Sequence, residues 1–456
     1  MIREDWVEVE LNEICDIYTG TGFPKKYQGE KKGKYPFYKV GDISKNVKKG
    51  FKVLKLCDNY IEDDIVEKIK GKVLPKDSIV FAKIGEALKL NRRALTTSFC
   101  LIDNNVTGVK FKDDGMSPLF LYYIFLLVRL EDYSRATTVP SVRKTDIEKI
   151  KLPLVPVPEQ RAIVAKIEEL FSELDSGIDS LKKARKQLEV YRQAVLKAAF
   201  EGKLTKKWRD DNSIKCFEWK YYKIGQILET IDGDRGKNYP KKHEYLDQGY
   251  CLFLSTKNVL KGEFNFDDTV FISKEKDEVL RGGKLERKDI VITTRGTLGN
   301  VAYYDNRVPY ENIRINSGML ILRIHNHDFL NPIYLMRFIN SSLFIQQLRR
   351  KQSGTAQPQI PARVLKEIDI MVPNSIGEQE EIIKEIESRL SVCENIEANI
   401  DEALKKAEGL RQSILKKAFE GELLSKEELE ACKQEDDWEP AEVLLKKIKE
   451  ATKEAK

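Results

Sequence analysis

Few residues of this 456-residue sequence occur in the combinations that catalysis requires. It contains three histidines, and two of them, His325 and His327, spell a literal His-Asn-His in the stretch RIHNHDF. The nuclease motifs of that name spread over tens of residues, so we interpret this stretch as a surface turn. A two-histidine metal site is the alternative, but no carboxylate partners at helical spacing are evident. Paired acids such as Asp63-Asp64 lie in turn-like contexts and are expected to be solvated.

Motifs for the common cofactors are also missing. The sequence has no GxxxxGK[ST] phosphate loop, no GxGxxG turn between strand and helix, and no Asn-Pro-Pro-aromatic string typical of adenine methyltransferases. We therefore expect neither an NTP-driven motor nor AdoMet chemistry, and no catalytic residues or metal site in this chain. By elimination, the sequence favours a binding scaffold over a catalyst.

Composition narrows the class of protein further. The seven cysteines are scattered and form no CxxC pair, which argues against a disulfide framework or a structural zinc site. The longest apolar stretch, Leu119 to Val128, is shorter than the ~20 residues of a membrane-spanning helix, and the amino terminus lacks a secretory signal. We expect a cytoplasmic protein. The net charge of +6 combines an acidic stretch of −3 at residues 425–456 with +9 before it, which fits a polyanionic partner without demanding one.

An internal repeat reveals the elements that must position any binding residues. Glu159–Leu204 aligns without a gap to Glu378–Leu423, with 18 identities in 46 positions. The two segments end in the related phrases YRQAVLKAAFEGKL and LRQSILKKAFEGEL. Upstream the similarity continues at shifted offsets, since Trp6 and Trp219 differ by 213 positions rather than 219. Each copy therefore has a variable globular part followed by a helix of fixed length.

Both helical segments carry the apolar spacing of a coiled-coil seam, with steps of mostly three and four residues. In the first copy the seam is expected at Ile163, Ile167, Leu170, Leu174, Ile178, Leu181, Leu188, Tyr191 and Val195. In the second copy it is expected at Ile382, Ile386, Leu390, Cys393, Ile396, Ile400, Ala403, Ala407, Leu410 and Ile414. Because either helix alone would leave an apolar stripe in water, we expect the two to pair; an ordinary helical bundle is the alternative.

The ends of these helices are marked by their residue types. Pro158 followed by Glu159 is typical of a helix start, whereas Gly202 and Gly421 indicate left-handed residues just beyond the ends. A continuous helix of about 43 residues would be ~65 Å long.

The globular parts are expected to be mixed α+β. Runs at Ile79–Ile84, Ile290–Thr294 and Met319–Ile324 indicate strands. Ser117-Pro118 and Asn331-Pro332 indicate capped starts of two helices, PLFLYYIFLLVRL and PIYLMRFINSSLFIQQLRR.

Together these features resemble the DNA specificity subunit of Type I restriction-modification systems. The resemblance rests on LPLVPVPEQRAIVAKIEELFSELD, GEQEEIIKEIE, the two repeated phrases and the tail WEPAEVLLKKI, and it covers nearly the whole chain. It implies an α+β fold with two target-recognition domains separated by two long helices that form an antiparallel coiled coil with pseudo-two-fold symmetry. The expected boundaries are a recognition domain at 1–157, a spacer helix at 158–204, a second recognition domain at 205–376, a second spacer helix at 377–424 and an acidic helical tail at 425–456.

The resemblance also implies a function. Each domain would read one half of a bipartite, interrupted site in double-stranded DNA, and the helix pair would set the spacing. The chain would be non-catalytic and hold no cofactor. It would recruit two adenine methyltransferase subunits, which bring AdoMet, and through them restriction subunits that use ATP and Mg.

If the chain binds DNA, Lys and Arg suit the phosphates, and Arg, Asn, Gln, Ser and Thr on loops suit the bases. The expected DNA-contacting residues of the first domain are Lys83, Gly85, Lys89, Arg92, Arg93 and Arg143. Those of the second domain are Arg295, Gly296, Thr297, Asn300, Gln352, Ser353, Gln357 and Gln359. The expected partner-docking residues at the helix ends are Arg192, Gln193, Lys197, Phe200, Gly202, Arg411, Gln412, Lys416, Phe419 and Gly421.

Two other classes of protein compete with this interpretation. A fused single-chain restriction enzyme would need the nuclease or methylase motifs that the sequence lacks. A coiled-coil adaptor with two modules for ligands other than DNA has the same helices, and only sequence-specific, salt-dependent DNA binding separates the two.

Overall fold

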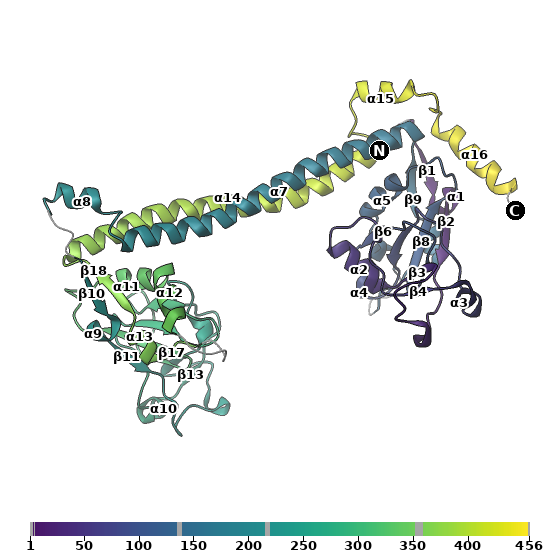
Figure 1. Cartoon of the computed structure of the whole chain (residues 1–456). Coiled ribbons are helices and arrows are strands. Elements are labelled where there is room, and N and C mark those ends of the chain that lie inside the picture. Colours follow the sequence, from purple (N-terminus) through teal and green to yellow (C-terminus); the bar gives the residue numbers. More distant parts are fainter. Residues whose placement is uncertain (1–2, 4, 135–138, 215–218, 352–358, 455–456) are drawn as a thin grey trace. The chain divides into compact units, whose positions relative to one another are not determined.

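The protein divides into two compact units, each with one globular domain and part of both long helices (Figure 1). The first unit is formed by Met1–Ser180 with Glu402–Lys456, and the second by Leu181–Asp401. The structure, a computed structural model, describes residues 3, 5–134, 139–214, 219–351 and 359–454.

Three small sheets form the globular part of the first unit. Strand β1 pairs antiparallel with β9, a four-stranded sheet has the order β2-β8-β5-β6, and a three-stranded sheet has the order β4-β3-β7. In the last of these, β3 and β7 are parallel. The strands are β1 (Val7–Glu10), β2 (Cys15–Thr19), β3 (Tyr35–Tyr38), β4 (Tyr60–Ile61), β5 (Ile79–Ala82), β6 (Arg93–Leu95), β7 (Leu101–Ile102), β8 (Val106–Phe111) and β9 (Lys151–Leu154).

Short helices connect these strands, and the most apolar of them packs on the four-stranded sheet. The α-helices are α1 (Leu11–Ile14), α2 (Val40–Lys48), α3 (Asp63–Lys68), α4 (Glu86–Lys89), α5 (Pro118–Leu127) and α6 (Lys144–Glu148). Two 3-10 helices are η1 (Lys25–Tyr27) and η2 (Leu130–Tyr133). Helix α5 buries most of its length, and Phe125 stacks on Phe81 of β5 with ring centroids 5.6 Å apart.

The second unit repeats this topology strand for strand. Its sheets have the orders β10-β18, β11-β17-β14-β15 and β13-β12-β16, and β12 and β16 are again parallel. The strands are β10 (Lys220–Lys223), β11 (Leu228–Asp232), β12 (Cys251–Leu254), β13 (Phe271–Ile272), β14 (Ile290–Thr293), β15 (Val301–Tyr303), β16 (Ile313–Ile315), β17 (Met319–Ile324) and β18 (Asp369–Val372). The helices are α8 (Lys206–Asp211), α9 (Ile224–Ile227), η3 (Lys242–Glu244), η4 (Thr256–Asn258), α10 (Lys274–Val279), α11 (Pro332–Ile339), α12 (Ser342–Lys351) and α13 (Ala362–Lys366). The predicted mixed α+β class and internal repeat are confirmed.

The proline-led helices begin as predicted. The hydroxyl of Ser117 accepts the N–H of Phe120 at 3.3 Å at the start of α5, and the side-chain oxygen of Asn331 accepts the N–H of Ile333 at 2.9 Å at the start of α11. The single helix predicted from Pro332 onward is wrong, because it breaks at Asn340. There Ser341 caps a new helix, α12, by accepting the N–H of Phe344.

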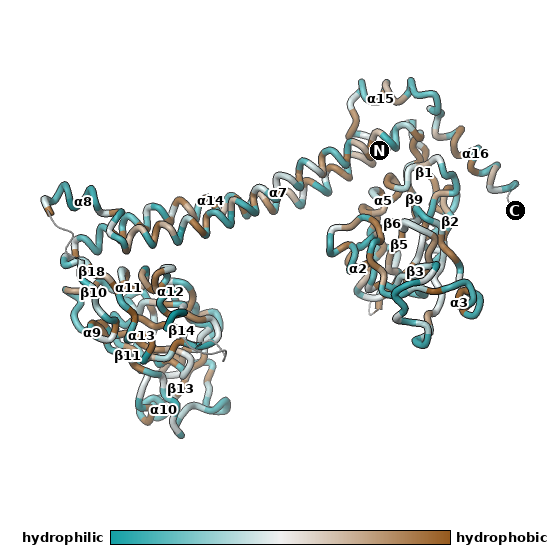
Figure 2. Tube along the Cα trace, in the orientation of Figure 1, coloured by the Kyte–Doolittle hydropathy of each residue, from teal (hydrophilic) through white to brown (hydrophobic). Residues whose placement is uncertain are grey.

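Two long helices carry the repeated phrases: α7 (Val157–Phe200) and α14 (Ile376–Glu420). In the first unit, the early part of α7 packs antiparallel against the late part of α14; in the second unit, the late part of α7 packs against the early part of α14. Hydrophobic and hydrophilic residues alternate along both helices, as Figure 2 shows. Gly202 and Gly421 have φ of 69° and 80°, so the predicted left-handed helix stops are confirmed.

The carboxyl-terminal residues form two helices, α15 (Lys426–Lys433) and α16 (Ala441–Glu454). Ala441, Leu444 and Ile448 of α16 are buried in the apolar core of the first unit. Among the described residues, no helix is both long and apolar enough to cross a membrane.

Candidate nucleic-acid interface

A buried glutamate at the start of each long helix anchors a segment that is distant in sequence. Glu159 has no exposed surface; it accepts the indole N–H of Trp6 at 3.0 Å and lies 3.4 Å from Arg3. Glu378, its repeat equivalent, accepts a guanidinium N–H of Arg209 at 2.5 Å. Each acid therefore fixes the segment that precedes a globular domain to the start of the long helix that follows that domain.

The glutamine that follows each glutamate positions a second helix. Gln160 accepts the backbone N–H of Ser117 at 3.1 Å and donates to the carbonyl of Val155 at 2.8 Å. Gln379 likewise accepts the N–H of Asn331 at 2.9 Å and donates to the carbonyl of Phe329 at 2.8 Å. The amide side chain thus bridges the N-cap of α5 or α11, which explains why Glu-Gln opens both repeats. Sequence reasoning noted the repeated pair but missed this role.

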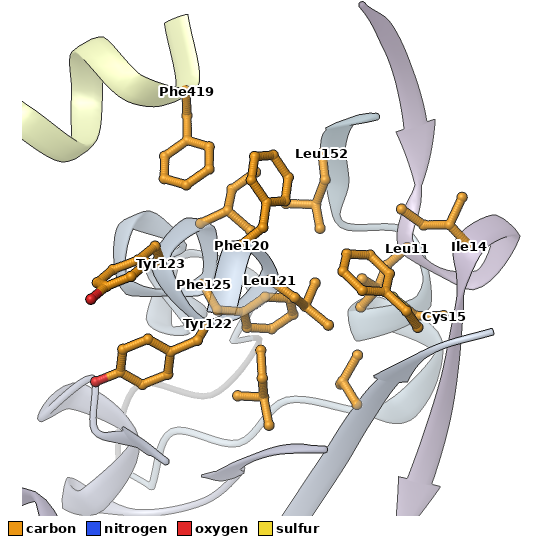
Figure 3. Close-up of a cluster of buried hydrophobic side chains, with 14 of the residues drawn as sticks. Leu11, Ile14, Cys15, Phe120, Leu121, Tyr122, Tyr123, Phe125, Leu152 and Phe419 are labelled. Carbon is orange, nitrogen blue, oxygen red and sulfur yellow. The ribbon is translucent and has the colours of Figure 1, made fainter. Parts of the chain in front are cut away.

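The phenylalanine of each repeated phrase is buried against a globular domain. Phe200 contacts Tyr334 edge-on, with ring centroids 5.1 Å apart, and Phe419 contacts Phe120 in the same way at 5.2 Å. Figure 3 shows Phe419 pointing from α14 toward Phe120. The prediction that Phe200 and Phe419 lie on a docking surface is wrong, because these rings anchor the end of α7 to the second domain and the end of α14 to the first.

The arginines of the repeated phrases face the partner helix. Arg192 lies 2.7 Å from Glu397 within the second unit. Within the first unit, Arg411 forms an ion pair with Asp175 and its guanidinium lies 4.8 Å from the ring centre of Phe171. Both arginines therefore contribute to pairing of the long helices.

The other predicted docking residues differ in exposure. Gln193 is half-buried and lines a cavity of about 700 Å³ between α7 and α12. Lys197, Gln412 and Lys416 are exposed, so they remain available to a partner.

The seam between the long helices departs from the prediction at three positions. Tyr191, Ile396 and Leu410 are 46%, 41% and 50% exposed, although the apolar spacing placed them in the seam. Their neighbours Glu397 and Arg411 occupy the seam instead, as the ion pairs show. A pattern based on apolar residues alone could not find charged seam positions.

In the first domain, most predicted DNA-contacting residues lie around the turn between β5 and α4. Gly85 has a φ of 74°, a backbone conformation that suits glycine, and space is open beside its Cα. Lys83 and Arg92 are half-buried, and Lys89 is exposed and paired with Glu86 at 2.8 Å. Arg143 is also exposed; it occupies the N-cap position of α6, where its side chain makes no capping hydrogen bond.

Arg93 does not fit a role at the DNA surface. Its side chain is 1% exposed, and its guanidinium lies 4.9 Å from the ring centre of Phe81. It also donates to Asn91 at 2.5 Å and to the carbonyl of Val128 at 3.4 Å. The structure thus contradicts the prediction for Arg93, which belongs to the domain core.

In the second domain, the matching turn follows β14. Arg295, Gly296 and Thr297 are exposed, whereas Asn300 is buried and donates to the carbonyl of Val259 at 2.9 Å. The hydroxyl of Thr293 donates to the carbonyl of Thr297 within the turn. Asn300 therefore shapes the loop rather than facing outward, while the three exposed residues stay candidates for DNA contact.

The remaining predictions concern the stretch before α13 and the histidines. Gln359 is exposed, and Gln352, Ser353 and Gln357 lie outside the described residues. His325 is exposed next to β17. In the part of the chain that the structure describes, no three His, Cys, Asp or Glu side chains are grouped so as to hold a metal ion.

Comparison with known proteins identifies the family. Residues 3–189 and 217–406 each match the Type I restriction modification DNA specificity domain. The chain is 25% identical over 460 residues to the Type I restriction enzyme EcoBI specificity subunit of Escherichia coli, covering 98% of this chain and 92% of that protein. It is 23% identical over 418 residues to the MjaVIII specificity subunit of Methanocaldococcus jannaschii, covering 89% and 91%.

Solved structures share the fold. A chain from a study of complex assembly and conformational transition in the type I R-M system matches with a TM-score of 0.67 and 18% identity, covering 92% of this chain and 99% of that one. The HsdS subunit from Thermoanaerobacter tengcongensis matches with a TM-score of 0.55 and 18% identity, covering 92% and 98%.

A DNA specificity domain matched twice, in a chain whose fold repeats twice, defines the class. The chain belongs to the Type I restriction-modification DNA specificity family, as a DNA sequence-recognition subunit with two repeated domains. The expectation from sequence is confirmed. Specificity subunits of this family are not catalytic, and the activities of a Type I system lie in its partner subunits.

Proposed function

We propose that this chain reads a bipartite, interrupted site in double-stranded DNA, with one half-site for each recognition domain and the long helices as the spacer. The domains would span 1–157 and 205–376, the spacer helices 158–204 and 377–424, and the acidic tail 425–456. The observation that carries the proposal is the anchoring of the helix ends: Phe200 is buried against the second domain and Phe419 against the first. The length of helix between these anchors would then fix the gap between half-sites.

The dimensions of the helices are suited to this task. α7 has 44 residues and α14 has 45, which at ~1.5 Å per residue gives about 66 Å each. Two turns of B-DNA, at ~34 Å each, span about the same length.

Inserting seven residues into both helices tests the spacer. A heptad after Lys183 and another after Leu404 would preserve the seam and add ~10 Å, or about three base pairs at ~3.4 Å each. We expect site selection by the full complex to recover both original half-sites with a gap about three base pairs longer. A variant in which one native heptad is replaced by another of equal length is the control, and an unchanged gap in the lengthened variant would refute the spacer.

For the half-sites, we propose contacts from the exposed or half-buried members of the predicted set. In the first domain these are Lys83, Gly85, Lys89, Arg92 and Arg143; in the second they are Arg295, Gly296, Thr297 and Gln359. Lys and Arg suit phosphates, while Arg, Thr and Gln also suit base edges. The alternative of an adaptor for ligands other than DNA is not favoured, because both domains match a DNA specificity domain.

We further propose that the chain works in the cytoplasm and recruits two adenine methyltransferase subunits, which bring AdoMet, and restriction subunits that use ATP and Mg. An exposed apolar stripe on the second unit's helix pair supports a docking role. Tyr191 of α7 and Val392 and Ile396 of α14 are exposed, and Val392 and Ile396 lie four positions apart on one helix face. Replacing Val392 and Ile396 by Gln should abolish co-purification of the methyltransferase without unfolding the chain; full retention of co-purification would exclude this stripe as the docking site.

The non-catalytic role has its own test. Methylation of DNA by the purified chain with AdoMet alone would refute it.

A further inference from the structure

The two recognition domains share a short basic motif that the function above does not use. Phe-Pro-Lys-Lys-Tyr at 23–27 and Tyr-Pro-Lys-Lys-His at 239–243 are 216 positions apart, and each follows the first strand of its four-stranded sheet. The same offset relates β3 to β12, so the two motifs occupy equivalent places in the fold.

Each motif is held on its domain by a contact between aromatic rings at equivalent positions. The ring of Phe23 stacks on Phe37 of β3, with centroids 3.8 Å apart, and the ring of Tyr239 meets Phe253 of β12 edge-on at 5.7 Å. In both domains, the contacted phenylalanine lies 14 positions after the aromatic residue that begins the motif. The carbonyl of the first lysine, Lys25 or Lys241, accepts a backbone N–H three residues on, at 3.1 and 2.9 Å. The lysine pairs are therefore presented on ordered turns.

The chain segments that lead to the two motifs lie beside the loops that we propose contact DNA. A Cβ on Gly20 would lie 1.8 Å from the carbonyl oxygen of Asp103, and a Cβ on Gly233 would lie 2.2 Å from that of Asn316. The chain thus crosses closely over the turn between β7 and β8, or between β16 and β17. These turns also hold the candidate loops, since Lys83 donates its backbone N–H to Asn105 and Arg295 donates to Gly318.

The charges of the paired lysines are not neutralised locally. Lys25, Lys26, Lys241 and Lys242 are all exposed, and among the described residues none of them has a carboxylate within ion-pair distance. Two other lysines of the same first-domain loop behave differently, because Lys31 lies 3.1 Å from Asp58 and Lys34 lies 2.6 Å from Asp63.

We infer that the two lysine pairs form equivalent phosphate-binding sites, which grip the DNA backbone at the same position of each half-site. This inference rests on the proposed DNA recognition and assigns the pairs to register and orientation rather than to sequence. An ammonium group donates to a phosphate oxygen without distinguishing bases. The repeat makes the contact symmetric, so each domain would be oriented on its half-site in the same way while its variable loops read different bases.

The test compares matched charge variants of the full-length chain. The first-domain variant is Lys25→Gln with Lys26→Gln, and the second-domain variant is Lys241→Gln with Lys242→Gln. Their controls remove the same charge from ion-paired lysines: Lys31→Gln with Lys34→Gln, and Lys223→Gln with Lys276→Gln. The probe is a fluorescent mixed-sequence DNA duplex of about 40 base pairs, titrated at several salt concentrations; circular dichroism checks that each variant folds.

We expect each test variant to reduce the slope of log affinity against log salt by about 1.8, at ~0.9 for each lost phosphate contact, and the two domains to lose similar amounts. The controls should change the slope by well under one unit. Equal losses in test and control variants would overturn the inference, because net charge alone would then explain binding. If the test variants bind the duplex with the wild-type affinity and salt slope, the inference is also overturned, but DNA recognition by the chain is not. If the wild-type chain binds no duplex, the proposed function itself is refuted.

Discussion

A guanidinium nitrogen of Arg192 on α7 lies 2.7 Å from a carboxylate oxygen of Glu397 on α14. Both side chains are only about a quarter exposed, at 28% and 26%, because they occupy seam positions between the helices. The long helices of the second unit are thus paired by an ion pair as well as by apolar contacts, and a charge pair specifies alignment more narrowly than apolar packing does.

A double-mutant cycle of Arg192→Ala and Glu397→Ala should reveal a coupling free energy of about 0.5–1 kcal/mol, as expected for a partly exposed pair. The coupling should shrink at high salt. Urea unfolding followed by circular dichroism measures it. The exposed pair of Glu402 and Lys406, 2.6 Å apart within α14, is the control and should couple by at most half as much. Equal coupling in both pairs would contradict a role in helix alignment.

Removing the buried acid at the start of α14 should cost far more. Glu378→Ala would remove the carboxylate that lies 2.5 Å from the buried guanidinium of Arg209, and we expect a loss of about 3–5 kcal/mol in unfolding free energy. Glu378→Gln keeps a hydrogen-bond acceptor and should lose less. Glu380→Ala, two residues away and exposed, should change the unfolding free energy by under ~0.5 kcal/mol. If Glu378→Ala behaved like Glu380→Ala, the anchoring role would be refuted.

Replacing two glycines by alanine, one just beyond the end of α14 and one inside it, should change stability in opposite directions. Gly421 has a φ of 80°, and an added Cβ would meet the side chain of Arg3 at 3.1 Å, so Gly421→Ala should destabilise by about 1–2 kcal/mol. Gly409 lies inside α14 with open space around its Cα, so Gly409→Ala should stabilise by up to ~1 kcal/mol. Thermal melts of the two variants, run in parallel, check the signs. A gain in melting temperature for Gly421→Ala would show that the left-handed stop is unnecessary.

The repeat could be recognised from the sequence because the phrases that end the two long helices share most of their residues. Ser117 and Asn331 cap the starts of α5 and α11, and Gly202 and Gly421 follow the ends of α7 and α14. Each acts locally, so its residue type alone predicted the helix boundary. Contacts between distant segments could not be predicted in this way. Arg93 has the charge of a DNA ligand, yet the fold buries it over Phe81.

The seam shows the same limit. The apolar spacing predicted Tyr191 and Ile396 as seam residues, but both side chains are exposed. Arg192 and Glu397 lie in the seam instead. Since a charge enters a seam only when a partner meets it across the interface, the sequence of one helix does not reveal it.

Asp277 should make the second domain sensitive to acid. Burial alone raises the pKa of Asp277, but Lys284 and Arg314, each 2.5 Å from its carboxylate, hold that pKa below its ordinary value of 3.8. A depressed pKa contributes stability that is present above the unfolded-state value and is lost as pH falls through the folded-state value. The unfolding free energy should therefore decrease as the pH drops below about 4. Asp277→Asn should weaken this pH dependence and should lower stability at neutral pH. An unchanged pH dependence in the variant would exclude Asp277 as its source.

Arg295 and Arg93 differ in exposure, so replacing each of them should distinguish an effect on DNA recognition from an effect on folding. Arg295 is exposed on the turn after β14, so Arg295→Ala should leave the melting temperature unchanged. If Arg295 contacts a base, the variant should lose about 1–3 kcal/mol of binding and relax one position of the second half-site only. Arg93→Ala should instead lower stability by about 1.5–3 kcal/mol through lost hydrogen bonds, with the selected sequence unchanged.

Site selection and a thermal melt on both variants distinguish these outcomes. Because Arg295 belongs to the second domain, the first half-site of its selected sequences should be identical to that of the wild type, which provides an internal control. A uniform loss of affinity across all sequences would reassign Arg295 to a phosphate contact, since phosphates carry no base identity. A change in the first half-site would contradict the division of the site between the two domains.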